Sequence, residues 1–213
     1  MKQILPILAF AAAFFGVPAS QASPLTFTAL LNGASEAPPN ASPGTASATV
    51  IFNTAAHTMD VSVIFSGLLG DTTASHIHCC TAAPNTGNVG VATTTPTFPG
   101  FPLGVSAGSY SHLFDMTLAS SYNPAFVTAQ GGIANAEATL FAGMLAQRSY
   151  FNIHSNLFPG GEIRGFLQAV PEPGSLALLG LGLAGLALSS RRNRAHINLI
   201  QRCQRGRDAI GAG

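Results

Sequence analysis

The sequence predicts an all-β protein with one short helix, folded as an antiparallel β-sandwich of about seven or more strands. Alternation of polar and apolar residues dominates from Leu25 onward, which is the pattern of half-buried strands. Only 8% of the 213 residues are charged, against roughly 25% in an ordinary globular domain. Strong turn signals, such as Phe158-Pro159-Gly160-Gly161, separate the alternating runs. A chain of many short strands joined by turns is typical of a sandwich.

The individual elements follow from these patterns. The runs 45–52 and 59–65 flank a turn at 53–57 and therefore predict a hairpin. The single helix is expected at 133–147, where Ala, Leu, Glu and Met are concentrated. A loop at 96–104, rich in Pro and Gly, carries Phe98, Phe101 and Leu103 and is expected to pack over the sandwich. The remaining expected strands are 25–30, 74–80, 109–118, 149–154 and 162–167.

The charge balance excludes one class of partner. Between residues 23 and 169 there are six acidic and two basic residues, a net charge of −4 with the histidines neutral. Six further arginines all follow residue 190. A folded part so poor in Lys and Arg has no surface suited to nucleic acid.

The first 22 residues have the features of a secretory signal peptide. Lys2 supplies a positive start, an apolar run extends from 4 to 17, and small residues precede a cleavage site between Ala22 and Ser23. The run is too short to cross comfortably a bilayer that requires about 20 apolar residues. We therefore expect an exported protein whose mature domain occupies residues 23–169.

The other end of the chain carries a sorting signal. Pro171, Glu172 and Pro173 precede an apolar run at 176–188 and a basic cluster at 191–194. In all three parts, residues 170–194 resemble the PEP-CTERM sorting tail. The resemblance implies recognition by an exosortase-type membrane enzyme, a transient inner-membrane segment, and display at or release from the surface of a Gram-negative bacterium that makes exopolysaccharide. An ordinary membrane anchor is the alternative, and the atypical extension 195–213 departs from the family pattern.

The middle of the chain resembles the CHRD domain. The resemblance rests on the opening segment 27–46, on the central Ser75-His76-Ile77-His78, and on the closing segment 150–165 with its Phe-Pro-Gly-Gly-Glu turn. It covers roughly residues 25–168. This family is named from chordin, a secreted antagonist of growth factors. The resemblance implies an immunoglobulin-like sandwich distantly similar to copper/zinc superoxide dismutases, and it implies no established activity.

The histidines form a candidate metal site. Alternate residues of a strand share a face about 6.6 Å apart, so His76 and His78 project together, and His154 joins them if its strand lies alongside. Imidazole nitrogens suit copper and zinc. Glu162 would be a further ligand or the acceptor that fixes a histidine tautomer, although Arg164 is expected to compete for it. A purely structural role for the histidines is the alternative, while His57, His112 and His196 are interpreted as non-functional.

Cys79 and Cys80 directly follow His78. An exported protein meets an oxidising compartment, but Cα atoms of neighbouring residues lie only about 3.8 Å apart, below the usual range for a disulfide. The sequence leaves three interpretations open: a vicinal disulfide, which we rank first, thiolate ligation beside the histidines, and intermolecular linkage. Cys203 lies beyond the sorting segment and is not expected to pair with either.

No nucleophile elbow, phosphate-binding loop or pair of carboxylates with recognisable spacing occurs in the sequence. We therefore expect no catalytic residues and a non-enzymatic exported protein of the exopolysaccharide or biofilm matrix. Its expected partners are the sorting enzyme and, beyond it, exopolysaccharide or surface proteins. One alternative is a copper- or zinc-binding or redox domain built on the histidines. Another is an adhesive or protein-binding module, by analogy with chordin.

Overall fold

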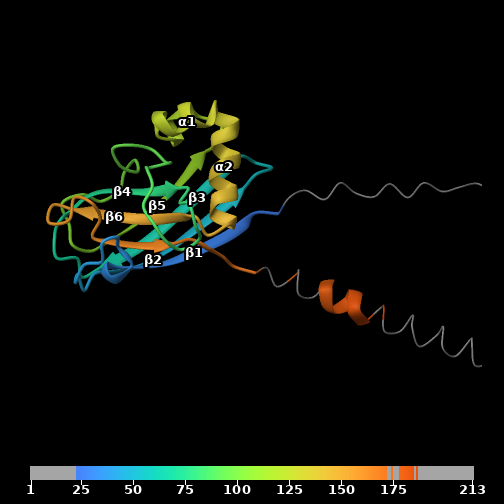
Figure 1. Cartoon of the computed structure of the whole chain (residues 1–213), viewed down its shortest axis with the longest axis horizontal. Helices are drawn as coiled ribbons and strands as arrows, with labels where there is room; N and C mark the ends of the chain where they lie inside the picture. The colour runs from blue at the N-terminus through green and yellow to red at the C-terminus, as the bar shows by residue number, and fades with distance from the viewer. Residues whose placement is uncertain (1–22, 172–173, 175–177, 185, 187–213) are drawn as a thin grey trace, which may run out of the picture.

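The computed structural model describes residues 23–171, 174, 178–184 and 186. Its main feature is a curled antiparallel sheet of eight strands in the order β4-β6-β7-β1-β2-β3-β5, with the short β8 also paired to β1 (Figure 1). This confirms the predicted all-β, sandwich-like class. The strands are β1 Leu25–Asn32, β2 Thr45–Asn53, β3 Thr58–Ser66, β4 Thr72–Cys79, β5 Gly108–Asp115, β6 Ser149–Ser155, β7 Ile163–Phe166 and β8 Gln168–Ala169.

The inward face of the sheet is apolar at alternate positions, as the period of two requires. The predicted helix is present as α2 (Ile133–Leu145). Its Phe141 ring lies 6.2 Å from Phe27 and 5.2 Å from Phe52, between ring centroids. The helix therefore packs against the inner residues of β1 and β2. Other fully buried side chains of this core include Phe65, Met59, Ile77, Phe98, Phe151, Met116, Leu140 and Met144.

The expectation of a single helix is wrong, because α1 (Pro124–Gln130) precedes α2. The Asn123 side chain caps its start by accepting a hydrogen bond from the Ala125 amide, and Pro124 occupies the first turn. Gly131 ends it with a φ of 77°, a conformation that favours glycine. Two short 3₁₀ helices, η1 (Gly33–Ser35) and η2 (Ala119–Ser121), lie elsewhere in the chain.

Most strand boundaries agree with the predictions. The hairpin of β2 and β3 is paired without interruption from Thr45 opposite Ser66 to Asn53 opposite Thr58. β5 ends earlier than expected because the Asp115 carboxylate accepts hydrogen bonds from the amide and hydroxyl of Thr117 and turns the chain. The last expected strand, 162–167, is β7, which begins only at Ile163, and the short β8 follows it beyond the expected range.

The free edge of β4 is covered by the segment 89–98. The amides of Ala92 and Phe98 donate to the carbonyls of Ile77 and Ser75, each at 3.0 Å. Phe98 is fully buried, and its ring centroid lies 5.7 Å from that of Phe151. As expected, the 96–104 loop therefore packs against the core, although its Leu103 is exposed.

The predicted signal peptide, the sorting residues Glu172 and Pro173, the basic cluster and the extension 195–213 lie outside the described residues. Among the helices that are described, none combines the length and the apolar character needed to cross a membrane.

Candidate metal centre

Three histidines meet on the outward face of β4 and β6. His76 and His78 flank the fully buried Ile77 and so point to the opposite side of β4. β4 pairs with β6 in a register that sets Ala74 opposite His154. One nitrogen atom from each of the three imidazoles lies within 4.8 Å of the other two. The geometry required of a three-histidine site is therefore present.

Each of these imidazoles is held by a backbone carbonyl. His76 Nε2 lies 2.5 Å from the Pro96 oxygen, His78 Nδ1 lies 2.8 Å from the Val89 oxygen, and His154 Nδ1 lies 2.9 Å from the Pro159 oxygen. A carbonyl can only accept a hydrogen bond, so each of these nitrogens carries the proton. The second nitrogen of each neutral ring is then a bare lone pair, which is the form that binds a metal.

Those second nitrogens have no partner. His76 Nδ1, His78 Nε2 and His154 Nε2 are all buried without a hydrogen bond. An unsatisfied buried polar atom costs about 1–3 kcal/mol, and such atoms are few in native proteins. Three of them in one cluster are difficult to explain as structural histidines. They fit a site that is completed by an ion.

Burial keeps the imidazoles neutral. Desolvation lowers the pKa of both His76 and His78 to about 4, and it also lowers the pKa of His154. Metal ions bind only the deprotonated nitrogen. The three rings are therefore in a ligand-competent state at neutral pH without having to lose a proton.

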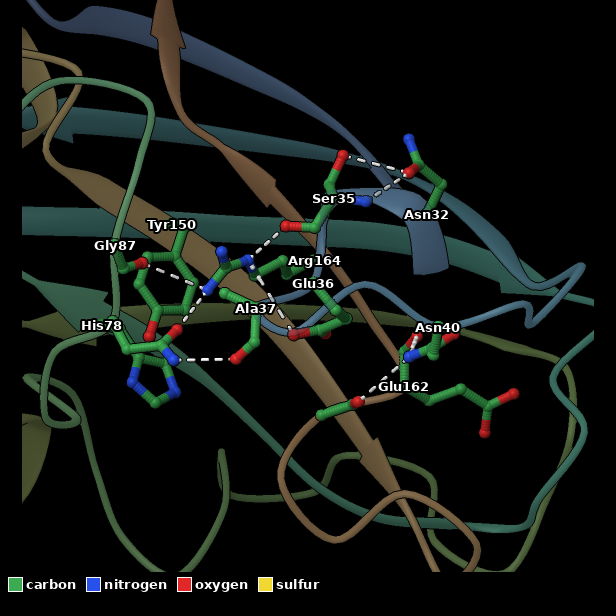
Figure 2. Close-up of polar contacts among 12 residues, drawn as sticks. Asn32, Ser35, Glu36, Ala37, Asn40, His78, Gly87, Tyr150, Glu162 and Arg164 are labelled. Atoms are coloured by element: carbon green, nitrogen blue, oxygen red, sulfur yellow. Dashed lines mark hydrogen bonds and ion pairs between the residues drawn. The ribbon is translucent and has the colours of Figure 1, made fainter.

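Two side chains, Tyr150 and Arg164, stack in succession on the His78 ring (Figure 2). The Tyr150 ring is 4.6 Å from the His78 ring and nearly parallel to it, at 9°, and the Arg164 guanidinium lies 4.8 Å from the centre of Tyr150. Arg164 also donates to the carbonyls of Ser35 and Gly87 and to the Asn88 side chain. It thereby fastens the loop whose Val89 carbonyl orients His78.

Glu162 does not reach the histidine cluster. Its carboxylate accepts hydrogen bonds from the Ser42 hydroxyl at 2.6 Å and from the Leu69 and Gly70 amides. It also points away from Arg164 (Figure 2). The expectation of a Glu162–Arg164 pair is wrong, because β7 starts after Glu162 and the shared-face rule does not extend to it. Glu162 is therefore neither a ligand nor a histidine acceptor in this arrangement.

The acid beside Arg164 is Glu36, whose Oε2 lies 3.8 Å from the guanidinium Nε. Burial raises the pKa of Glu36 to about 7 even though Arg164 opposes the shift. Its Oε1 and the Asn152 Oδ1 are buried without partners, and both lie 2.7 Å from the place that a Cβ on Gly161 would take, so a side chain there would clash. Glu36 was not predicted as a site residue. The available signal was an acidic residue within the segment 27–46 that resembles the opening of the CHRD domain.

The two adjacent cysteines form a vicinal disulfide between Cys79 and Cys80. Their sulfur atoms lie 3.9 and 3.6 Å from the Thr139 carbonyl on α2. β4 ends at Cys79, so Cys80 does not continue the histidine face. Thiolate ligation beside the histidines does not occur in this structure. Cys203 lies outside the described residues.

The other two histidines within the described part of the chain lie apart from the cluster. His57 Nδ1 lies within hydrogen-bond distance, 2.8 Å, of the Glu137 carboxylate, and the His112 ring contacts Phe114 with 4.5 Å between centroids. His196 lies outside the described residues.

The fold and tail together define a class: an exported β-sandwich domain followed by a sorting motif. The CHRD domain family model matches residues 27–167, and the chain belongs to this family. A second model, the PEP-CTERM protein-sorting motif, matches residues 169–192. That motif implies export, processing by an exosortase-type enzyme, and sorting to the cell surface or beyond it. Neither a curated protein nor a solved structure matches the chain significantly.

Proposed function

We propose that this exported CHRD domain binds a transition metal ion, copper or zinc, through His76, His78 and His154. The observation that carries the proposal is the set of three buried imidazole nitrogens without hydrogen-bond partners, each belonging to a ring already oriented by a carbonyl. Imidazole nitrogens are ordinary ligands of copper and zinc in proteins.

The proposed role is non-enzymatic. The sequence contains no recognisable catalytic motif, and both cysteines near the cluster are engaged in the disulfide. The place of action is the extracellular polysaccharide matrix of a Gram-negative bacterium. The sorting tail supports this placement, because proteins that carry it are displayed by exopolysaccharide-producing cells. An adhesive or protein-binding role is the alternative, and it rests on the family name alone.

The decisive experiment is the metal content of the full chain, purified without added metal and again after loading. We expect one equivalent of copper or zinc per chain. The double variant His76→Ala/His78→Ala should lose it, because one remaining imidazole cannot hold the ion. His112→Gln is the matched control, since it removes a histidine outside the cluster and should retain the metal.

Absence of metal from both the native chain and the control, even after loading, would contradict the proposal. A second signal comes from fluorescence. The chain has three tyrosines and no tryptophan, and Tyr150 stacks on His78. Copper binding should therefore quench tyrosine emission in the native chain and leave the double variant unchanged.

A further inference from the structure

We propose that the site is built for the monovalent cuprous ion, Cu⁺, which it holds in a closed complex of three imidazoles. This inference rests on the proposed metal-binding function and narrows it to one ion and one oxidation state. It follows from the number of donors, from their closure to solvent and from the local charge.

The first argument is the number of donors. The cluster in the described chain contains three histidines and no carboxylate or thiolate. Glu162 is occupied by Ser42, Leu69 and Gly70, and the two sulfur atoms near α2 are bonded to each other. Zn²⁺ takes four ligands in proteins, and Cu²⁺ favours tetragonal sites with nitrogen and oxygen ligands. Of the three ions Cu⁺, Zn²⁺ and Cu²⁺, only Cu⁺ has its coordination completed by three neutral donors.

The second argument is closure. A zinc site with three protein ligands keeps an open position for water. Here all three free nitrogens are buried, the residues His76 and His78 are only 6% and 8% exposed, and His154 is half-buried. Burial of all three donor atoms favours a site to which solvent supplies no ligand. The site therefore suits an ion that is stable without one.

The third argument is charge. The ligands are neutral, and the charged group stacked on His78 through Tyr150 is the Arg164 guanidinium. The Glu36 carboxyl lies 3.8 Å from that guanidinium and offsets part of its charge. Arg164 lies two stacked layers away, 4.8 Å from Tyr150, which is 4.6 Å from His78. At that separation one additional positive charge on the ion weakens binding on the order of ten-fold.

The test is a set of competition titrations on the full chain in mild detergent. Cu⁺ is titrated without oxygen against a chromophoric cuprous chelator, and Zn²⁺ and Cu²⁺ are titrated against chelators of known affinity. X-ray absorption of the copper-loaded chain then reports oxidation state and coordination number. We expect one Cu⁺ with three nitrogen ligands, bound at least about 100-fold more tightly than Zn²⁺. The substitution His76→Gln should lower the affinity for Cu⁺ by at least about 100-fold. The substitution His112→Gln should leave that affinity unchanged.

The outcomes separate this inference from the proposed function. A histidine-dependent site that prefers Zn²⁺ or Cu²⁺, or that holds copper with four or more ligands, overturns the cuprous assignment and leaves metal binding intact. Failure of all three ions to bind overturns both.

Discussion

The outward face of the sheet differs sharply between its two ends. Over β2, β3 and β5 it presents hydroxyl side chains such as Ser47 and Ser111 beside the apolar Ile64 and Leu113, all exposed to solvent. Over β4, β6 and β7 the same face carries His76, His78 and Arg164, all less than 9% exposed beneath covering loops. Polar groups with no partner are easily tolerated in water and costly when buried. Stability alone therefore does not explain why polar residues such as His76 and His78 occur at the covered end of the face.

The largest expected difference between the two ends is their response to acid. In the metal-free chain the pKa of His76 and His78 is about 4 when folded and 6.5 in the reference state. Stability from these groups is therefore fully present above pH 6.5 and lost as the pH falls toward 4. Glu36 acts in the opposite direction, because its folded pKa of about 7 exceeds its reference value of 4.5. We expect a net loss of about 3 kcal/mol between pH 6.5 and 4.

Denaturant unfolding of the metal-free chain at several pH values measures this loss. In the variant His76→Gln/His78→Gln, the free energy of unfolding should change less between pH 6.5 and pH 4. If the variant loses as much stability as the native chain over this range, groups other than these two histidines are responsible.

The next effect concerns the loop that covers the histidine end. Phe98→Ala removes a fully buried ring that contacts Tyr110, Phe114 and Phe151. Truncation of such a ring costs about 3 kcal/mol, and it should also loosen the Pro96 carbonyl that orients His76. Thermal unfolding and metal titration on one sample report both effects. Full affinity in a destabilised variant would show that the loop does not orient the ligand.

A smaller effect is expected at Arg164, which joins the covering loops to the sheet. Arg164→Lys retains the charge and loses the planar guanidinium that donates to Ser35, Gly87 and Asn88. We expect a loss of about 2 kcal/mol in stability and roughly ten-fold in metal affinity, the size of effect known for groups that orient ligands. Isothermal titration of both proteins measures the affinity ratio. Equal affinities would limit Arg164 to a structural role.

The smallest effect belongs to the open end. Ser111→Ala removes an exposed hydroxyl on β5, and we expect a change in stability within about 0.5 kcal/mol and no change in metal affinity. Chemical denaturation checks the first expectation and metal titration the second. A large change at this position would contradict the division of the face into a covered and an open end.

The sequence allowed much of this architecture to be predicted. The period of two placed His76 and His78 on one face, and the turn signals located the β2–β3 hairpin. The position of His154 depended on the pairing of β4 with β6, which is a long-range choice that no local pattern dictates. The helix α1 was missed although Asn123 and Pro124 are an ordinary start signal.

The polar contacts of the site were less accessible to sequence reasoning. Arg164 pairs with Glu36 rather than with Glu162 because of where β7 begins. The alternation of polar and apolar residues does not fix the end of a strand to within one residue. The absence of partners for the three nitrogens depends on the folding of the loops 83–97 and 156–161. The three histidines could therefore be predicted as metal ligands from the sequence, while the burial and orientation of their rings could not.

The separation of the three histidines along the chain has a consequence for when an ion is acquired. His78 and His154 come together only through the pairing of β4 with β6, and the orienting carbonyls of Val89 and Pro96 belong to the segment that docks on the edge of β4. An unfolded chain presents only the local His-x-His pair, so it cannot retain a metal through a three-donor site. At the proposed site the ion would therefore be supplied by the compartment in which the chain folds, and the occupancy of the mature protein would record the metals available there rather than those of the cytoplasm.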